Sequence, residues 1–228
     1  PRVVFFRLHN ALGQHGGYAR ARHATKIGKN CSISPLAVVA KENVIIGDNV
    51  VIEEFAVIRD NVTIGDNCVI HAGVKIGFND FEYKKENGKL FTVAHYGGVI
   101  LGEEVELHPN TCVNKALYPW DNTVIGDRCK IDMLVQVSHG VKVGRDTMIV
   151  GLSGIGGRTE IGENSWIGYG CIIRNGVHVG NNARANMGAV VSRDVADGQA
   201  VTGNFAIDHD IFMENLKRAA KPTKERNE

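Results

Sequence analysis

The sequence predicts an all-β fold, a parallel β-helix built from stacked three-sided coils, on two observations. From Ile125 to Val191 an aliphatic residue recurs at every sixth place, and eleven of these twelve positions are Ile or Val. The tetrapeptide Ile-Gly-Asp-Asn occurs at 46–49 and again at 64–67, eighteen residues later. A fixed six-residue period is typical of a hexapeptide solenoid and of neither an α-helix nor an alternating strand. Three hexads therefore form one coil, with the recurring aliphatic side chains pointing inward.

Composition excludes several classes of protein. The 228 residues hold 26 Lys and Arg against 25 Asp and Glu, so no global basic field favours nucleic acid. The sequence contains no run of about 18 apolar residues, so no membrane-spanning helix is predicted. The five cysteines lack the spacing of a metal site or a disulfide framework, and no His-x4-His pair occurs, so no metal site is expected. Small buried thiols fit a reducing cytoplasm.

Three segments are expected along the chain. Residues 1–24 lack the period and hold a short amphipathic helix that ends near Gly13, which we expect to pack at the base of the solenoid. Residues 25–206 form the β-helix domain, whose inward positions include Ile27 and Ile33 in the first coil. Residues 207–228 form a helix, capped by Asp208, and a basic tail. We expect this helix to cover the last coil, whose open edge would otherwise pair with other strands.

Two insertions interrupt the coils, at 77–98 and 114–123. The first is polar and aromatic, and the second contains Pro119, which cannot donate to a sheet ladder. Long excursions from a regular solenoid are more often functional than accidental, because the coils gain nothing from them. Both insertions are therefore candidate parts of a site, with a subunit-packing arm as the alternative for the first.

Three further stretches resemble the left-handed β-helix acyltransferases, and most closely the UDP-3-O-acylglucosamine N-acyltransferase family of lipid A synthesis. They are residues 76–83 (IGFNDFEY), 98–106 (GVILGEEVE) and 137–144 (VSHGVKVG). The likeness covers roughly residues 25–220. The opening PRVVFF is similar to the helix that follows this family's N-terminal uridine-binding domain, which implies that the chain is the coil portion of a longer protein. Departures occur at Asn114-Lys115-Ala116, where the family has Asp-Arg-Gly, and at Gly176, where it has a second His.

The resemblance implies that His139 is the catalytic general base. It lies two residues after the inward Val137, at a corner slot, and should face outward where a neighbouring subunit covers it. Transfer of an acyl group from a thioester to an amine needs a proton acceptor, and imidazole titrates near working pH. The Gly157 amide, one coil later, is the first candidate to bind the oxyanion. Asp121, one coil earlier, is an uncertain orienting carboxylate, and His71, His95, His108 and His178 are weaker candidates.

The implied donor is an acyl group on a phosphopantetheine arm, carried by coenzyme A or acyl carrier protein, with no tightly bound cofactor. The residues expected to line its slot are Gly156, Tyr169, Arg174, Gly203 and Asn204. The implied acceptor is the amine of a nucleotide-linked amino sugar. The residues expected to contact it are Phe78, Asp80, Phe81, Tyr83, His95, Tyr118 and Trp120. The resemblance also implies a homotrimer with sites between subunits.

Two other functions remain open. One is a short-acyl or acetyl-coenzyme A enzyme that acts on a nucleotide-linked amino-dideoxy sugar. The other is a non-catalytic β-helix scaffold, which predicts no effect of changing His139. A zinc carbonic anhydrase on the same coil would need three convergent His ligands, two of them close in sequence.

Overall fold

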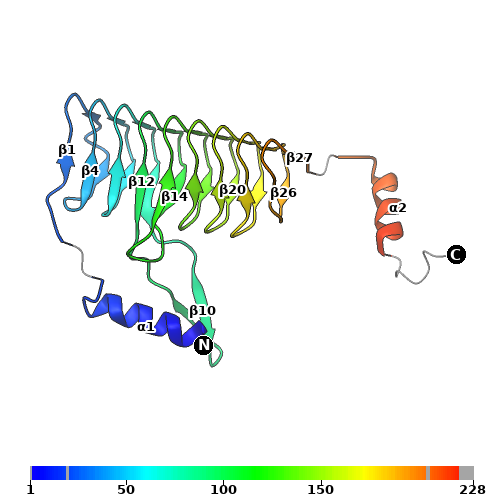
Figure 1. Ribbon diagram of the computed structural model, residues 1–228, viewed down its shortest axis with the longest axis horizontal. Helices are drawn as coiled ribbons and strands as arrows, with labels where there is room; N and C mark the ends of the chain where they lie inside the picture. The colour runs from blue at the N-terminus through cyan, green and yellow to red at the C-terminus, as the bar shows by residue number, and fades with distance from the viewer. Residues whose placement is uncertain (1, 19–20, 204–205, 221–228) are drawn as a thin grey trace.

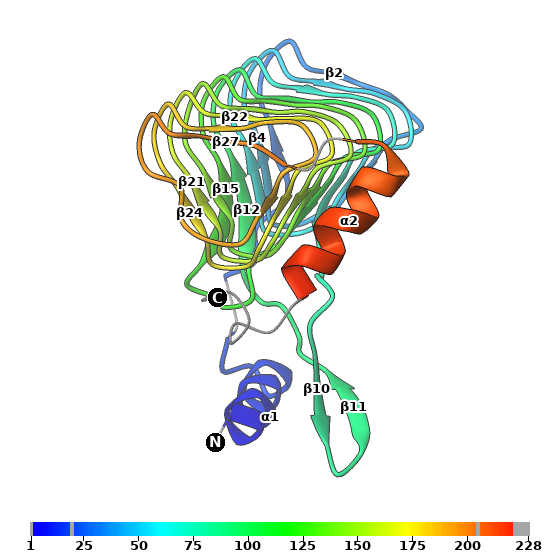
Figure 2. The same cartoon turned by 90° about the vertical axis from the view of Figure 1, so that its right-hand side faces the viewer.

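The computed structural model describes residues 2–18, 21–203 and 206–220. Its body is a left-handed parallel β-helix of three-sided coils (Figure 1), which confirms the predicted fold class. Seen along the axis, the coils superpose as a triangular prism (Figure 2). In the regular coils equivalent strands pair eighteen residues apart, as Gln136 pairs with Gly154 and Gly154 with Ile172. The spacing is nineteen residues in the first coil and sixteen in the last. No described helix is long and apolar enough to cross a membrane.

Three parallel sheets form the sides of the prism in the described residues, and each coil visits them in the order I, II, III. Sheet I contains β1 (Lys26–Ile27), β4 (Val44–Ile46), β7 (Val62–Ile64), β12 (Gly98–Leu101), β15 (Asn122–Ile125), β18 (Lys142–Val143), β21 (Glu160–Ile161) and β24 (His178–Val179). Sheet II contains β2 (Ser32–Ile33), β5 (Val51–Ile52), β8 (Val69–Ile70), β13 (Glu106–Leu107), β16 (Lys130–Ile131), β19 (Met148–Ile149), β22 (Trp166–Ile167), β25 (Arg184–Ala185) and β27 (Ala200–Val201). Sheet III contains β3 (Val38–Val39), β6 (Val57–Ile58), β9 (Lys75–Phe78), β14 (Cys112–Asn114), β17 (Gln136–Val137), β20 (Gly154–Ile155), β23 (Ile172–Ile173) and β26 (Val190–Val191).

The core of the prism is the aliphatic column that the six-residue period predicts. From Ile125 to Val191 every one of these side chains is at most 5% exposed. Burying one such side chain stabilises the fold by about 1.5–3 kcal/mol. The first coil differs, because Ile27 is 53% exposed at the open end of the prism. Ile27 pairs in register with the buried Ile46, so it takes the predicted inward position but is left uncovered in the first coil.

Small polar and sulfur-containing residues fill the corners of the prism. Cys68, Cys129 and Cys171 are buried there, and burial raises the pKa of Cys68 to about 11, so its thiol stays protonated. Asn residues such as Asn49 and Asn67 take the left-handed backbone at the turns, each with φ near 58°. Asn tolerates this conformation better than most residues with a Cβ, which explains its recurrence at the corners.

The first insertion contains an antiparallel hairpin, β10 (Tyr83–Glu86) and β11 (Lys89–Thr92). Its turn, Asn87-Gly88, has two positive φ values, 47° and 80°. Asn-Gly favours that geometry, so the pair is a hairpin signal that the sequence analysis did not use. The hairpin leaves the prism at the corner between sheets III and I (Figure 2).

Helix α1 (Arg2–Gln14) packs on this insertion rather than at the base of the solenoid (Figure 1). Arg7 pairs with Glu86 at 2.7 Å, and its guanidinium lies 4.1 Å from the centre of the Phe91 ring. Phe6 joins a small apolar cluster with Val93 and Leu117, which is separate from the main core. The helix therefore holds the two insertions together.

Helix α2 (His209–Ala220) stands away from the last coil (Figure 1). Asp208 accepts hydrogen bonds from the amides of Asp210 and Ile211 at 3.0 and 3.4 Å, as expected of an N-cap. Ile211, Phe212 and Leu216 are each more than half exposed. The expectation that this helix covers the last coil is therefore wrong, and the basic tail at 221–228 lies outside the described residues.

Candidate active site

Both insertions and His139 occupy the same edge of the prism, between sheets III and I. The first insertion joins β9 to β12 and the second joins β14 to β15. His139 lies between β17 and β18, at the next corner along this edge. The coil register thus places His139 beside the loops, and its ring lies outside the prism.

A carboxylate from the first insertion holds His139 in place. Asp80 Oδ2 lies 2.7 Å from His139 Nδ1 and accepts a second hydrogen bond, of 2.9 Å, from the His139 amide. The other oxygen, Oδ1, accepts from the Phe81 amide at 2.8 Å and from Asn114 Nδ2 at 3.0 Å. The side chains of His139 and Asp80 are only 9% and 6% exposed. His139 is therefore covered by its own chain, and not only by a neighbouring subunit as the sequence analysis expected.

The charge of Asp80 sets the tautomer of His139. Burial opposes ionisation of the carboxyl, but hydrogen bonds from His139 and Phe81 outweigh it and hold the pKa of Asp80 well below its usual value. An ionised carboxylate only accepts hydrogen bonds, so His139 Nδ1 carries the proton. In the neutral ring the lone pair then lies on Nε2. This is the arrangement that a general base needs.

A cavity of about 210 Å³ opens beside His139 and is also lined by Gly157, Arg158 and Asn175. Gly157 has so little space that a Cβ on it would lie 2.5 Å from His139 Cε1 and 2.6 Å from Nε2. Among the described residues the Gly157 N–H finds no acceptor. A proton acceptor and an unpaired amide donor therefore lie side by side at one small cavity, and base-assisted acyl transfer uses groups of both kinds.

His95 lies on the other side of His139, with ring centres 5.6 Å apart. Its Nδ1 donates to the Val93 carbonyl at 3.1 Å, whereas Nε2 is buried without a partner among the described residues. Burial and the neighbouring His139 lower the pKa of His95 to about 4, so the ring is neutral near pH 7. Nε2 is then an unsatisfied acceptor, which a ligand N–H or O–H would pair.

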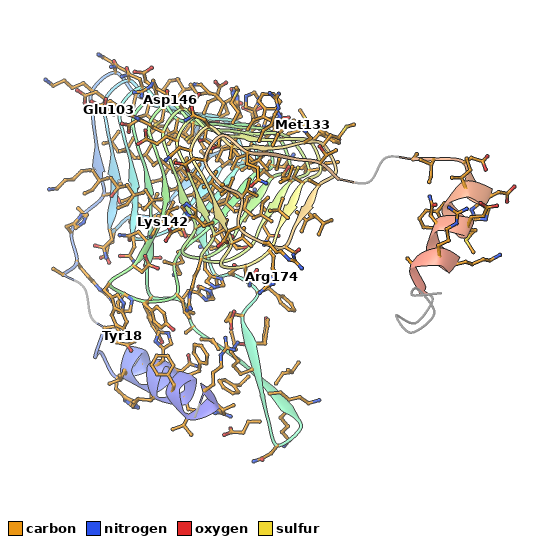
Figure 3. All side chains as sticks on the ribbon, turned by 45° about the vertical axis from the view of Figure 1, so that its right-hand side comes forward. Tyr18, Glu103, Met133, Lys142, Asp146 and Arg174 are labelled. Carbon is orange, nitrogen blue, oxygen red and sulfur yellow. The ribbon has the colours of Figure 1, made fainter. Side chains whose placement is uncertain are left out.

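The predicted donor residues separate into two groups. Gly156 and Arg174 line a cavity of about 300 Å³ on the outer face of sheet III, and Asn175 is shared with the cavity at His139. Arg174 marks this edge of the coils in Figure 3. Tyr169 and Gly203 lie at the opposite edge of sheet III, where Gly203 stacks on Gly188. Asn204 lies outside the described residues.

The predicted acceptor residues are also dispersed. Asp80 and His95 meet His139, and Phe78 lines a separate cavity of about 410 Å³ with Arg59 and Asp60. Phe81 is 86% exposed and contacts Tyr83 on the outside of the insertion. Tyr118 and Trp120 stack on each other with ring centres 5.1 Å apart, and Arg158 donates to the Tyr118 hydroxyl at 3.1 Å.

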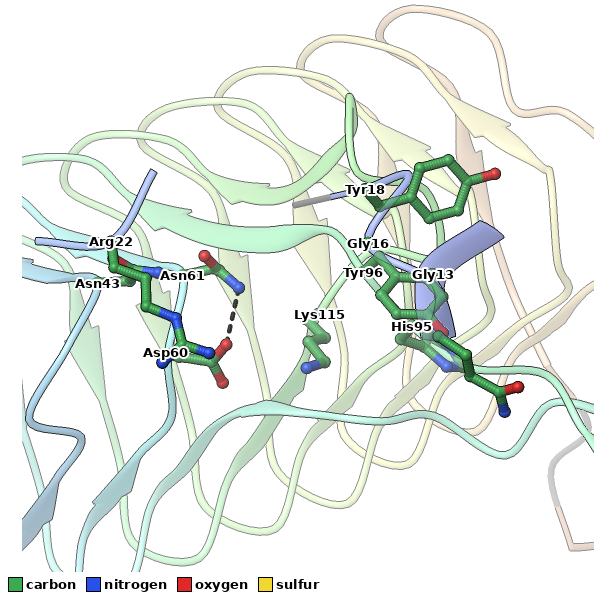
Figure 4. Close-up of a pocket in the computed structure, with 11 residues that line it drawn as sticks. Gly13, Gly16, Tyr18, Arg22, Asn43, Asp60, Asn61, His95, Tyr96 and Lys115 are labelled. Atoms are coloured by element: carbon green, nitrogen blue, oxygen red, sulfur yellow. Dashed lines mark hydrogen bonds between the residues drawn. The ribbon is translucent and has the colours of Figure 1, made fainter. Parts of the chain in front are cut away.

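Another cavity, of about 330 Å³, extends from His95 along the same edge toward the first coils (Figure 4). Tyr18 and Tyr96 border it at one end, and Arg22, Asp60 and Asn61 border it at the other. Except for His95 and the adjacent Tyr96, these residues could not be singled out from the sequence. They come from the segment after α1, one coil corner and the end of the first insertion, so no single motif joins them.

Sequence reasoning also missed the partner of His139. Asp121, the carboxylate expected from coil spacing, instead binds Lys142 Nζ at 2.6 Å. Asp80 is 59 residues from His139 and lies on an insertion, where the six-residue register gives no position. Asn114, which fixes Asp80, replaces the family's Asp at a site noted only as a departure.

Two models of repeat families match the chain. The bacterial transferase hexapeptide (six repeats) matches residues 43–77 and 122–157, and the hexapeptide repeat of succinyl-transferase matches residues 158–193. The chain therefore carries hexapeptide repeats of the transferase type. The second stretch that the first model matches, residues 122–157, contains both His139 and Gly157.

Curated relatives of this hexapeptide-repeat protein are nucleotide-sugar acyltransferases by name. UDP-3-O-acylglucosamine N-acyltransferase of Delftia acidovorans is 33% identical over 63% of the chain and 42% of the relative. UDP-3-O-acylglucosamine N-acyltransferase 2 of Legionella pneumophila is 35% identical over 83% of the chain and 49% of the relative. The chain thus spans about half the length, or less, of these relatives. The structure of the Campylobacter jejuni UDP-N-acetylglucosamine acyltransferase superposes with a TM-score of 0.72 at 22% identity, covering 86% of this chain and 79% of that one, which supports the fold.

Gly157→Ala tests the packing of the His139 ring. The added methyl would lie within 3.0 Å of three ring atoms, so the ring must shift away from Asp80. The backbone itself is unstrained, because Gly157 does not have a positive φ. We expect transfer activity to fall by at least about tenfold, since small misplacements of a catalytic group are costly. Steady-state kinetics check the loss, and an unchanged circular dichroism spectrum and melting temperature show that the coils persist. Full activity would mean that the ring position is unimportant.

Proposed function

We propose that the chain is an acyltransferase that moves an acyl group from a phosphopantetheine thioester to the amine of a nucleotide-linked amino sugar. The observation that carries this proposal is the buried Asp80–His139 pair, whose imidazole packs against Gly157 beside one cavity. The names of the curated relatives support the same class of reaction. The donor carrier is coenzyme A or acyl carrier protein, and no tightly bound cofactor takes part.

The reaction follows from the positions of the hydrogen-bonding groups. The amine nitrogen attacks the thioester carbonyl and a C–N bond forms, while His139 Nε2 takes a proton from that nitrogen. The carbonyl oxygen becomes an oxyanion, to which the Gly157 N–H donates. The C–S bond then breaks, and the proton on Nε2 passes to the departing thiolate. Asp80 stays ionised throughout and stabilises the transient imidazolium.

The two substrates approach His139 from opposite directions along the prism edge. The groove on sheet III, with Gly156 and Arg174, takes the extended pantetheine arm. The cavity that begins at His95 takes the sugar nucleotide, with His95 Nε2 accepting from a sugar N–H or O–H. The guanidinium groups of Arg22 and Arg59 border this cavity and its neighbour, as suits a diphosphate.

We further propose that the protein works as a homotrimer with sites between subunits. Ile172 and Val190 on the outer face of sheet III are 48% and 72% exposed, beside the donor groove. A neighbouring prism edge would cover this apolar strip and close the groove. The free, buried cysteines suit a reducing compartment, and we place the reaction in the cytoplasm.

A thiol-release assay with a matrix of donors and acceptors tests the function. Acetyl-, short-acyl- and long-acyl-coenzyme A and the same acyl groups on acyl carrier protein are each combined with UDP- and dTDP-linked amino sugars. We expect thiol release to depend on both substrates and the product to be the N-acylated sugar by mass spectrometry. Release only with acetyl-coenzyme A and an amino-dideoxy sugar would assign the alternative enzyme. If no combination of donor and acceptor gave transfer, the proposed activity would be wrong and the non-catalytic scaffold would be the remaining function.

A further inference from the structure

A second cluster of titratable side chains lies on a different edge of the prism, between sheets II and III. His71 follows β8 and His108 follows β13, which is the next strand of sheet II. Their rings are stacked one coil apart, with centres 4.8 Å from each other. Glu106, on β13, points its carboxylate between them. None of these residues lines the cavities at His139 or His95.

Three donor atoms converge at this edge. His71 Nε2 lies 2.9 Å and His108 Nε2 lies 3.4 Å from the same oxygen, Glu106 Oε1. Without a metal, a proton on His71 Nε2 joins the ring to Glu106. An unprotonated imidazole and a carboxylate both present lone pairs, so a divalent cation can take the place of that proton. Tetrahedral Zn²⁺ with bonds of 2.0–2.1 Å separates its ligands by about 3.3 Å. The two distances to Glu106 Oε1, 2.9 and 3.4 Å, lie on either side of that value, and all three atoms lie within 4.8 Å of one another.

Outer groups orient two of these donors, His71 and Glu106. Glu53 Oε1 lies 3.0 Å from His71 Nδ1, while Glu53 Oε2 is fixed by the Ala72 amide at 2.9 Å. Lys130 Nζ lies 3.3 Å from Glu106 Oε2, which directs Oε1 toward the two histidines. A carboxylate on the second nitrogen of a ligating histidine, and a donor on the second oxygen of a ligating carboxylate, are the usual outer contacts of a metal site.

We propose that His71, Glu106 and His108 bind one divalent transition metal ion, with Zn²⁺ the best match to two nitrogens and one oxygen. Because the His108 side chain is 38% exposed, a water molecule has access to the fourth position. The ion joins the coils on either side of the first insertion, since His71 precedes the hairpin and His108 follows it. It would thereby clamp the coils from which the loop carrying Asp80 departs.

Cobalt binding to the full 228-residue chain, free of any affinity tag and stripped with a chelator, tests this site. We expect one Co²⁺ per chain, with visible absorption of tetrahedral strength, displacement by Zn²⁺ and a raised melting temperature. His108→Ala should abolish saturable binding. Because the His108 side chain is partly exposed, the substitution should leave the chain folded, and loss of binding would not reflect unfolding. Glu53→Gln should weaken binding by about 10–100-fold, the usual effect of losing an outer-shell partner.

His178→Ala serves as the matched control, because His178 is an exposed histidine beside a carboxylate, Glu160, on another sheet. Its cobalt affinity and spectrum should equal those of the parent chain. Absence of saturable binding by the parent would overturn the proposal. So would equal affinity in the parent and His108→Ala, which would leave only adventitious surface binding. These readouts do not depend on acyl transfer, so failure here leaves the proposed function standing, and the reverse also holds.

Discussion

His139→Ala is expected to reduce acyl transfer by roughly 10²–10⁴-fold, the usual contribution of a positioned general base. The amine nitrogen would lose the acceptor for its proton, and the thiolate would lose its proton donor. The coils should remain folded, because the ring lies outside the prism and Asp80 keeps three donors: the amides of residue 139 and Phe81, and Asn114 Nδ2. The measurement is the thiol-release rate at saturating substrates.

Two companion variants sharpen this test. Asp80→Asn preserves the shape of the side chain and removes its charge, so it should lower kcat more than it changes KM. His178→Ala removes an exposed histidine that does not line the cavity and should behave as the parent. If His139→Ala turned over at the parental rate, His139 would have no catalytic role and the site would have to be sought elsewhere.

Ile155→Asp is expected to unfold or dissociate the coils. Ile155 is 1% exposed and stacks between Val137 and Ile173 in the core of the prism. A carboxylate there has no cation to pair with, and a buried unpaired charge costs several kcal/mol. That is comparable with the total stability of about 5–15 kcal/mol for a typical domain. Melting followed by circular dichroism, together with sedimentation, measures the loss.

The control for this variant uses the outward face of a neighbouring strand. Met148 is 44% exposed on β19, so Met148→Asp places the same carboxylate in water and should melt within a few degrees of the parent. Ile155→Val shortens the inward side chain by one methylene and should cost about 0.5–1.5 kcal/mol. An Ile155→Asp protein as stable as Met148→Asp would show that position 155 does not face the core.

The coil could be predicted because its physical constraint is local and repeats. Each inward position, Ile149 and Ile155 among them, meets equivalent residues one coil above and below, so one steric requirement appears in the sequence many times. The N-cap at Asp208 was predictable for a similar reason, since the side chain bonds amides two and three residues away. The corner position of His139 also followed from the register.

The partners of His139 could not be predicted from the period. Asp80 and His95 lie on an insertion, where chain length no longer determines the position of a residue along the prism. The packing of α1 on that insertion depends on long-range contacts such as Arg7 with Glu86, 79 residues apart. The same insertion separates His71 from His108, so their adjacency was hidden although both occupy the same corner slot.

The hairpin departs from and returns to the prism with only a local disturbance of its ladders, a register shift between β9 and β14 at Val113 and Asn114. β9 stays paired with β6, and β12 stays paired with β7 in unshifted register. The hairpin strands, which lie after Asp80 and before His95, are thus free to lengthen or shorten while Asp80, His95 and the scaffold beneath keep their positions around His139. Substrate preference in such a protein would therefore diverge by changes in the loop, while the β-helix that carries it stays the same.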